Sequence, residues 1–258
     1  MFFHFKEYIK HLTNSCNKHG VHSPFVYDFI TKCLYKKASK EDVSFFEKYR
    51  FNLKTSSKVV CIEEYGAGSR VFKSNIRKVS QIVEVAGIKR KYGLLLMRMM
   101  SYFEVKTCLE IGTSLGLATL CLQAKEPKML LTTLEGCKNT LEVAKEQFDR
   151  FGLKNIKVVL GDFKVTLPKA VKNNNYDVVY FDGNHTKTAT LGYFKECLKA
   201  KHNNSIFIFD DIHWSQGMCE AWDEIKKHPE VTVTIDIFQW GIVFFRKEQR
   251  KEHFTIRL

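Results

Sequence analysis

The chain has 258 residues, of which 45% are hydrophobic and 27% are charged, with only 4 Pro and 14 Gly. These values are typical of a globular protein with a sizeable core, and they exclude collagen-like repeats and low-complexity disorder. The net charge is +13, and most of it lies in residues 1–106, where 20 basic side chains face 9 acidic ones. Residues 107–258 hold 21 basic and 19 acidic side chains. We therefore predict two parts: a basic N-terminal region over residues 1–106 and a nearly neutral domain over residues 107–258.

The sequence also bears on where the protein resides. No apolar stretch approaches the roughly 20 residues that a membrane-spanning helix needs. The first residues, MFFHFKEYIKH, carry charges where a secretory signal would be apolar. Eight cysteines are scattered without a C-x-x-C pair, a pattern that indicates neither a disulfide framework nor a zinc site. We expect a cytoplasmic protein without a membrane span.

In chain order, helical spacing of apolar residues appears first over residues 5–12, 24–35, 41–52 and 89–103, and Pro24 suits a helix start. Residues 58–69 are expected to form a strand or extended segment that ends in a Gly-rich turn. The N-terminal region is thus predicted to be a mostly helical cap. Residues 19–25 (HGVHSPF) and 66–69 (GAGS) are candidate lid elements that contact substrate, although ordinary turns at helix ends explain them equally well.

From residue 107 onward, seven short apolar runs alternate with segments of helical length. The runs cover residues 107–111, 129–134, 156–160, 176–181, 205–209, 231–237 and 241–245, and the helical segments cover 115–124, 139–151, 164–172, 186–200 and 215–227. This alternation predicts an α/β fold with a doubly wound, largely parallel, seven-stranded Rossmann-like sheet. Only three residues, 238–240, separate the last two runs, so we expect an antiparallel C-terminal hairpin that puts one reversed strand into the sheet.

The turn after the first strand is the most informative segment, CLEIGTSLGLAT over residues 108–119. Gly112 lets the backbone turn tightly beneath a ligand, and Gly116 lets the following helix approach it. The spacing is E-x-G-x-x-x-G and differs from the G-x-G-x-x-G of dinucleotide-binding proteins. An ordinary strand–helix turn explains these glycines about as well.

Acidic residues stand where the next two strands end. Glu135 follows the second strand, and its carboxylate can accept hydrogen bonds from both hydroxyls of a ribose. Gly161 and Asp162 follow the third strand, where the Asp162 carboxylate can accept from the exocyclic amine of adenine. Acids at strand ends also cap helices. Three such features at successive strand ends favour a cofactor site.

On these residues the chain resembles the class I S-adenosylmethionine-dependent methyltransferases. Residues 107–246 follow the strand order of that family, including the terminal hairpin VTVTIDIFQWGIVFFR. The resemblance implies that S-adenosylmethionine is the cofactor, with Glu135 at its ribose and Asp162, beside Gly161, at its adenine. It implies further contacts from the turn at the methionine end and from the helix that precedes the first strand: Glu110, Gly112, Thr113, Ser114, Gly116, Tyr92 and Gly93.

Two more strand ends carry acids. Asp182 ends the fourth strand and is followed by His185, and Asp210 and Asp211 end the fifth and are followed by His213. The carboxyl ends of parallel strands meet at one edge, where close carboxylates repel by about 4 kcal/mol per pair at an effective dielectric of 20. A bound Mg²⁺ would relieve that repulsion and would lower the pKa of a coordinated hydroxyl. The alternative is that Asp182 and Asp210 cap the next helices and that His213 is peripheral.

This second pattern resembles the metal-dependent O-methyltransferases, both catechol-type and antibiotic-sugar-type. The resemblance implies Asp182, Asp210 and Asp211 as metal ligands, although catechol-type enzymes have Asn in the third position. Their general base is a Lys three residues after the first Asp, and here that residue is His185. An Asp-x-x-His spacing occurs in the sugar-modifying relatives. His185, with Asp182 beside it, is therefore the candidate catalytic base, and an unperturbed histidine pKa of about 6.5 suits proton removal near neutrality.

The sequence thus predicts an enzyme that methylates a hydroxyl of a small molecule with S-adenosylmethionine, assisted by Mg²⁺. RNA stays open as an alternative partner, because the N-terminal region is basic and some methyltransferases of this type modify tRNA wobble uridines. Its basic residues are dispersed, however, and form no recognisable RNA-binding module. A non-catalytic cofactor-binding protein is the third interpretation, and a homodimer is the assembly that we consider.

Overall fold

The computed structural model of the chain describes residues 2–63 and 72–258, so the predicted turn over residues 66–69 lies outside the described residues. The chain forms two units, each of which is described by itself. Unit 1 combines Met1–Tyr35 with Leu167–Leu258, and unit 2 is Lys36–Thr166. These boundaries differ from the change in composition at residue 106, because the first 35 residues group with the C-terminal part of the chain. The functional division into a cap and a cofactor domain stays a prediction.

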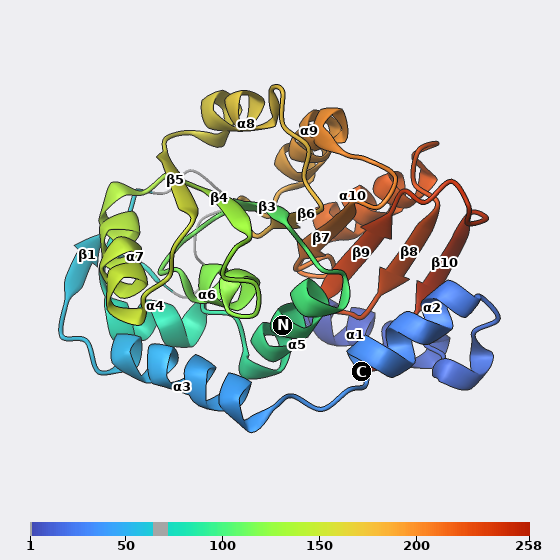
Figure 1. Cartoon of the computed structure of the whole chain (residues 1–258), viewed down its shortest axis with the longest axis horizontal. Helices are drawn as coiled ribbons and strands as arrows, with labels where there is room; N and C mark the ends of the chain where they lie inside the picture. The colour runs from blue at the N-terminus through green and yellow to red at the C-terminus, as the bar shows by residue number, and fades with distance from the viewer. Residues whose placement is uncertain (1, 64–71) are drawn as a thin grey trace. The chain divides into compact units, whose positions relative to one another are not determined.

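Unit 2 contains three parallel strands with helices between them (Figure 1). Strand β4 (Leu130–Glu135) pairs on one side with β3 (Thr107–Ile111) and on the other with β5 (Ile156–Leu160). Four of the five β3 residues are buried, as expected for a parallel strand that is covered on both faces. The helices lying wholly within unit 2 are α3 (Lys40–Lys54), α4 (Val79–Val85), α5 (Arg90–Tyr102), α6 (Leu117–Gln123) and α7 (Lys138–Phe151).

A short antiparallel hairpin also belongs to unit 2. It pairs β1 (Val59–Cys61) with β2 (Ile76–Lys78), and Val60 lies opposite Arg77. The expected strand at the start of residues 58–69 is therefore present as β1. Helix α8 (Phe163–Val171) contains the point where the chain passes from unit 2 into unit 1.

Unit 1 contains five strands in the order β10-β8-β9-β7-β6. Strand β9 (Trp240–Phe244) is antiparallel to both of its neighbours, β7 (Ile206–Asp210) and β8 (Val233–Asp236), which confirms the terminal hairpin and the reversed strand. Strand β6 (Val178–Phe181) is parallel to β7. The helices lying wholly within unit 1 are α1 (Phe2–Asn14), α2 (Pro24–Phe29), α9 (Lys187–Cys197) and α10 (Gln216–Lys227), with short turns at Lys18–Gly20, Ile30–Leu34 and Leu198–Ala200.

The expected count of seven strands is wrong by one. Strand β10 (Glu252–Thr255) pairs in parallel with β8, with Phe254 opposite Ile235, and brings the strands β3 to β10 to eight. No apolar run marks this strand, because Glu252 and His253 are exposed in it and charged side chains commonly protect an edge strand. The α/β class with its mostly parallel, doubly wound strands is confirmed.

The HGVHSPF segment has a local explanation. Ser23 is the N-cap of α2 and its Oγ accepts a hydrogen bond from the Val26 amide at 3.4 Å, while Pro24 occupies the first turn. Residues Lys18–Gly20 form a single 3₁₀ turn that Asn17 caps. A role in contacting substrate stays a prediction. Among the described residues, no helix is long and apolar enough to cross a membrane.

Candidate cofactor and acceptor sites

The turn after β3 in unit 2 adopts backbone angles that suit glycine. Gly112 has φ 106°, and Gly116, the N-cap of α6, has φ 77°. A Cβ built on Gly116 would lie 2.7 Å from the Tyr49 hydroxyl and would also collide with the Phe148 ring, so this glycine is required by packing as well as by its angle. Gly112 donates its amide to the Leu134 carbonyl at 3.0 Å, which fastens the turn to the end of β4.

Glu135, at the end of β4, is held by that turn. Its carboxylate accepts from the Ser114 amide at 2.7 Å and from the Cys137 amide at 2.8 Å, one bond to each oxygen. Thr113, in contrast, is only 2% exposed and bonds to Thr133 and the Leu134 carbonyl. The turn therefore fixes the orientation of the Glu135 carboxylate, and its contact with the ribose hydroxyls stays a prediction.

Glu110 lies inside unit 2. The side chain is completely buried, and one of its oxygens accepts from the Thr119 and Thr133 hydroxyls, each at 2.6 Å. Its carboxylate thus joins the start of α6 to β4 beneath the turn. From this position it supports the shape of the turn.

The two cofactor candidates that follow β5 differ in their surroundings. Gly161 has φ 140° and donates its amide to the Glu135 carbonyl at 2.8 Å, so the ends of β4 and β5 are coupled. Asp162 is exposed, and its Oδ1 accepts from the Lys164 amide at 2.9 Å at the start of α8. The capping role that acids often have at strand ends is therefore present at Asp162.

The helix before β3 carries Tyr92 and Gly93. Gly93 is buried on α5, and a Cβ there would lie 2.6 Å from the Phe46 ring, so close packing between α5 and α3 explains this glycine. Tyr92 is partly buried, with the Lys91 ammonium 5.7 Å from its ring centroid. Cofactor contact by these two residues stays a prediction.

In unit 1, the acids at the ends of β6 and β7 gather around one histidine. His185 Nε2 lies 3.5 Å from Asp182 Oδ1, and ligand atoms of Asp182, His185 and Asp210 all lie within 4.8 Å of one another. The His185 and Asp182 side chains are 24% and 23% exposed. We call these three residues together with Asp211 the acidic cluster. The predicted convergence of these strand ends is present within this unit.

A residue that the sequence argument missed, Gln239, completes the acidic cluster. Its Nε2 donates to Asp210 Oδ1 at 3.0 Å and to Asp211 Oδ1 at 2.6 Å. Strand β9 pairs Trp240 with Asp210, which places Gln239 beside the end of β7. The sequence feature that could have pointed to Gln239 is its position as a polar residue in a very short hairpin connection. Asp211 itself has φ 56°, an uncommon backbone angle for an aspartate.

The carboxylates of the acidic cluster repel one another and attract a proton to His185. Burial raises the pKa of Asp210 well above its ordinary value, and the neighbouring Asp211 and Asp182 carboxylates add to this rise. Burial also raises the pKa of Asp211. At His185, burial lowers the pKa, but the hydrogen bond and charge of Asp182 and the charges of Asp211 and Asp210 outweigh it and raise the pKa to about 9. In the metal-free protein, His185 therefore carries a proton at neutral pH and serves as the cation of the cluster.

The alternative of helix capping is wrong for both acids. Helix α10 has Ser215 as its N-cap, and the Ser215 Oγ accepts from the Met218 amide at 3.2 Å. Helix α9 has Thr186 as its N-cap and has no side-chain cap bond there. Asp182 and Asp210 therefore do not cap these helices. His213 bonds to Asp236 at 2.8 Å and is about seven-eighths buried, so it belongs to a different group of side chains.

These arrangements fit the groups that the sequence implied. An oriented carboxylate at Glu135 and positive φ angles at Gly112 and Gly161 fit a nucleoside-containing cofactor at the strand ends of unit 2. The acidic cluster offers carboxylate oxygens that lie close together, and burial, followed by the charges of Asp211 and Asp182, raises the pKa of Asp210. Mg²⁺ prefers such oxygen ligands.

Part of the chain is similar to a known protein family. Residues 109–212 match the family model of a methyltransferase domain. That span contains the turn after β3, Glu135, Asp162 and the whole acidic cluster. No curated protein sequence matches the chain.

Several solved methyltransferase structures share the fold. A methyltransferase from Podospora anserina, bound to S-adenosylhomocysteine, has a TM-score of 0.60 and 14% identity, and the match covers 88% of this chain and 98% of that one. An O-methyltransferase from Bacillus cereus, also with S-adenosylhomocysteine, has a TM-score of 0.56 and 16% identity, covering 86% and 97%. The O-methyltransferase TomG from Streptomyces achromogenes, in complex with S-adenosylmethionine, has 0.55 and 16%, covering 63% and 82%.

Proposed function

We propose that this chain is a class I S-adenosylmethionine-dependent methyltransferase and that it transfers the methyl group to a hydroxyl oxygen of a small molecule with the help of a divalent cation. The observation that carries the proposal is the acidic cluster of unit 1, in which two strand ends bring carboxylates around His185. Methyl transfer to oxygen needs a positioned and deprotonated hydroxyl, and this cluster contains the groups that such a task requires.

Unit 2 holds the methyl donor in this proposal. Glu135, oriented by the Ser114 and Cys137 amides, accepts from the ribose hydroxyls. Asp162 keeps one carboxylate oxygen for the adenine amine while the other receives the Lys164 amide. Gly112 keeps the turn open to the methionine end, and Glu110 supports that turn from within.

Unit 1 activates the acceptor. Asp182, Asp210 and Asp211 are the residues that would hold Mg²⁺, and Gln239 orients the latter two. When bound, the cation supplies Lewis-acid polarisation of the acceptor hydroxyl and lowers its pKa. Because the charges of these carboxylates keep His185 protonated in the metal-free protein, a cation that offset them would lower the pKa of His185 from about 9 and allow the ring to accept the hydroxyl proton. Asp182, 3.5 Å from Nε2, would orient that ring and stabilise the resulting imidazolium.

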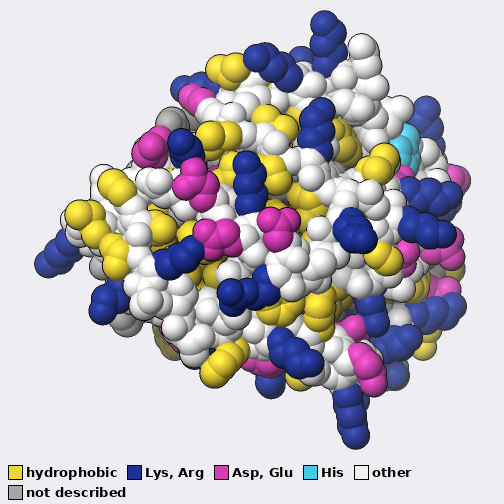
Figure 2. Space-filling view, turned by 60° about the vertical axis from the view of Figure 1, so that its left-hand side comes forward, with side chains coloured by type: hydrophobic (Ala, Val, Ile, Leu, Met, Phe, Trp, Pro, Cys, Tyr) yellow, Lys and Arg dark blue, Asp and Glu magenta, His cyan; other side chains and the backbone are white. Residues whose placement is uncertain are grey.

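An RNA acceptor is the competing proposal, and the face drawn in Figure 2 supports it weakly. On the face drawn in Figure 2, Lys and Arg side chains are interspersed with acidic and hydrophobic ones instead of gathering in one patch. Residence in the cytoplasm is part of our proposal, and it agrees with eight free cysteines. A homodimer stays a prediction that light scattering can test.

A labelled-methyl experiment tests the proposal. Full-length protein, S-adenosylmethionine with a labelled methyl group and a cell extract divided into RNA and small-molecule fractions are incubated with Mg²⁺ or with chelator. We expect label in the small-molecule fraction, lost with chelator and lost in Asp182→Asn. Label in RNA would establish the competing acceptor, and chelator-resistant transfer would refute the cation. Tight binding of S-adenosylhomocysteine without transfer to either fraction would favour a non-catalytic protein.

A further inference from the structure

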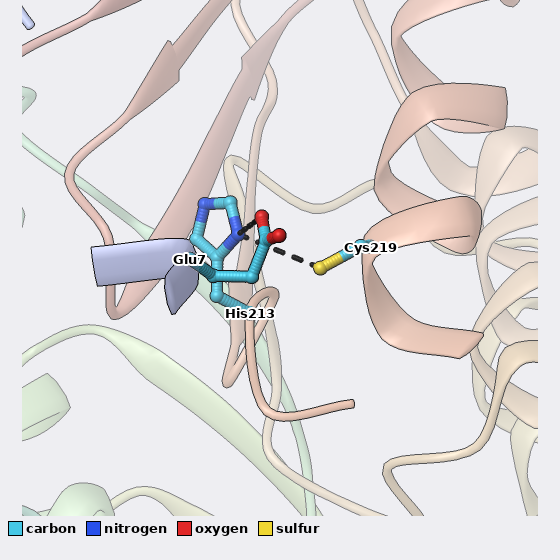
Figure 3. Close-up of side chains that lie close together, drawn as sticks. All are labelled: Glu7, His213 and Cys219. Carbon is cyan, nitrogen blue, oxygen red and sulfur yellow. Dashed lines mark hydrogen bonds and ion pairs between the residues drawn. The ribbon is translucent and has the colours of Figure 1, made fainter. Parts of the chain in front are cut away.

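A second cluster of donor side chains lies in unit 1, outside the acidic cluster. It joins Glu7 of α1, His213 of the segment after β7 and Cys219 of α10 (Figure 3). His213 Nδ1 lies 3.6 Å from Cys219 Sγ and 3.9 Å from Glu7 Oε2. The three ligand atoms all lie within 4.8 Å of one another, and the Glu7 and His213 side chains are each 13% exposed.

The other side of the His213 ring is held by a carboxylate. Its Nε2 lies 2.8 Å from Asp236 Oδ2, and because a carboxylate only accepts hydrogen bonds, Nε2 is the donor in this contact. Asp236 is in turn held by the Phe238 amide at 2.8 Å. The Phe238 ring also stacks on His213, with centroids 5.2 Å apart and planes at 12°. Nδ1 is therefore the ring nitrogen that faces Glu7 and Cys219.

This arrangement is the one that metal-binding histidines have. A histidine that binds a metal through one nitrogen usually donates its other N–H to a carboxylate, which fixes the tautomer and the ring orientation. Here Asp236 is that carboxylate. The nitrogen, sulfur and oxygen atoms of the three side chains lie within 4.8 Å of one another, and a cation would bring them closer together. Lys10 lies 3.7 Å from Glu7 Oε2 but is 67% exposed, so it neutralises this group only weakly.

We propose that Glu7, His213 and Cys219 bind one Zn²⁺ ion, with water as the fourth ligand. Tetrahedral zinc at ordinary bond lengths separates a nitrogen from a sulfur ligand by about 3.6 Å and from an oxygen ligand by about 3.4 Å. The observed separations of 3.6 and 3.9 Å need only a small movement of Glu7. A thiolate and an imidazole favour Zn²⁺ over Mg²⁺, so the donor set distinguishes this site from the acidic cluster.

Zinc binding has a definite proton balance. Burial, followed by the charge of Glu7, raises the pKa of Cys219 to about 11, so the metal-free protein holds a thiol there. The bound ion displaces that single proton to solvent, and no oxidant or reductant takes part. Because the ligands come from α1, from the segment after Asp211 and from α10, the ion would fasten the N-terminal helix to the segment that follows β7. Cysteine spacing alone cannot reveal a site whose ligands are so far apart in the sequence.

Cobalt substitution tests the site without reference to turnover. Full-length protein freed of metal receives Co²⁺, and the thiolate-to-cobalt charge-transfer absorption is recorded; competition with a zinc chelator then gives the Zn²⁺ affinity. We expect the absorption in the wild type, in Cys61→Ser, which alters an exposed cysteine elsewhere, and in Asp182→Asn, which alters the acidic cluster. Cys219→Ser should abolish it and should weaken Zn²⁺ binding at least tenfold.

A second variant keeps the test decisive if Cys219→Ser fails to fold. Glu7→Gln removes a ligand from the surface of α1 and should also weaken Zn²⁺ binding at least tenfold while the thiolate absorption shifts. The proposal is overturned if the wild type shows no thiolate absorption. It is also overturned if the folded Cys219→Ser variant, or Glu7→Gln, binds Zn²⁺ as tightly as the wild type. Loss of binding in Asp182→Asn would instead assign the zinc to the acidic cluster.

Discussion

The paired charges of the acidic cluster predict how the stability of the metal-free protein depends on pH. Asp182, Asp211 and Asp210 raise the pKa of His185 to about 9, although burial opposes them. A raised histidine pKa means that the folded state binds the proton more tightly than the unfolded state does. The resulting stability is fully present below the unfolded pKa of about 6.5, and it is lost as the pH rises through 9.

The magnitude follows from the same two values. Each tenfold change in proton affinity corresponds to about 1.4 kcal/mol, so a rise in pKa from 6.5 to about 9 corresponds to about 3 kcal/mol of unfolding free energy. The His185 side chain is 24% exposed, so solvent screens this interaction only in part. His185→Gln removes the titrating group. The free energy of unfolding should then change little over the same range, and at pH 6 the variant should be less stable than the wild type.

Urea unfolding in the presence of chelator, at intervals from pH 6 to pH 9, measures this difference. The matched control is His202→Gln, which removes a histidine paired with Asp177 at 3.0 Å, away from the acidic cluster. The control should retain the slope of the wild type. Equal slopes in the wild type and His185→Gln would refute the assignment of His185 as the cation of the cluster.

Three further predictions concern the turn, the ribose contact and the cation. Gly116→Ala should lower the free energy of unfolding by at least about 2 kcal/mol in urea titrations, whereas Gly152→Ala, with φ 66° and open space around its Cβ, should cost only about 1 kcal/mol. Glu135→Gln should weaken S-adenosylhomocysteine binding about tenfold or more by calorimetry, and Glu142→Gln, on the exposed side of α7, should leave it unchanged. Asp210→Asn should stabilise the protein at pH 7 in the presence of chelator, because burial raises the pKa of Asp210 and so disfavours its charged form. The same variant should show no rise in Tm when Mg²⁺ is added. A rise in Tm equal to that of the wild type would contradict the assignment of Asp210 as a metal ligand.

The order of strands and helices after residue 107 could be predicted because parallel strands are buried on both faces. Residues 107–111 and 156–160 are strands with the predicted bounds. Strands that lack a buried apolar run could not be predicted from the sequence. Strand β10 is one of them, since it is short, charged and at an edge. The grouping of residues 1–35 with the C-terminal part was also beyond reach, because periodicity within a helix does not identify its packing partner.

The site could be predicted as far as position along a strand determines it. Acids at the ends of neighbouring strands come together at one edge in unit 1, as Asp182 and Asp210 do. Side-chain direction and hydrogen-bond partners are not contained in that pattern. Glu110 is buried beneath the turn, and Gln239 reaches the acids from another strand. These contacts depend on rotamers and register, which a single sequence does not specify.

The division into two units also changes where the surplus of basic side chains is located. Residues 1–35 hold only 4 basic and 2 acidic side chains, whereas residues 36–106 hold 16 and 7. Because the first segment belongs to unit 1, the surplus lies in unit 2, with 24 basic and 14 acidic side chains against 17 and 14 in unit 1. The N-terminal helix α1 therefore lies in the same unit as the acidic cluster, and its segment carries too little positive charge to bind a phosphate backbone tightly.

An RNA acceptor would have to bind through residues 36–106. Its affinity would fall steeply with salt, with a logarithmic slope of about −0.7 per phosphate contact on a single strand. An uncharged small molecule that meets the acidic cluster of unit 1 would show no such slope, so the salt dependence of KM distinguishes the two acceptors before either is identified.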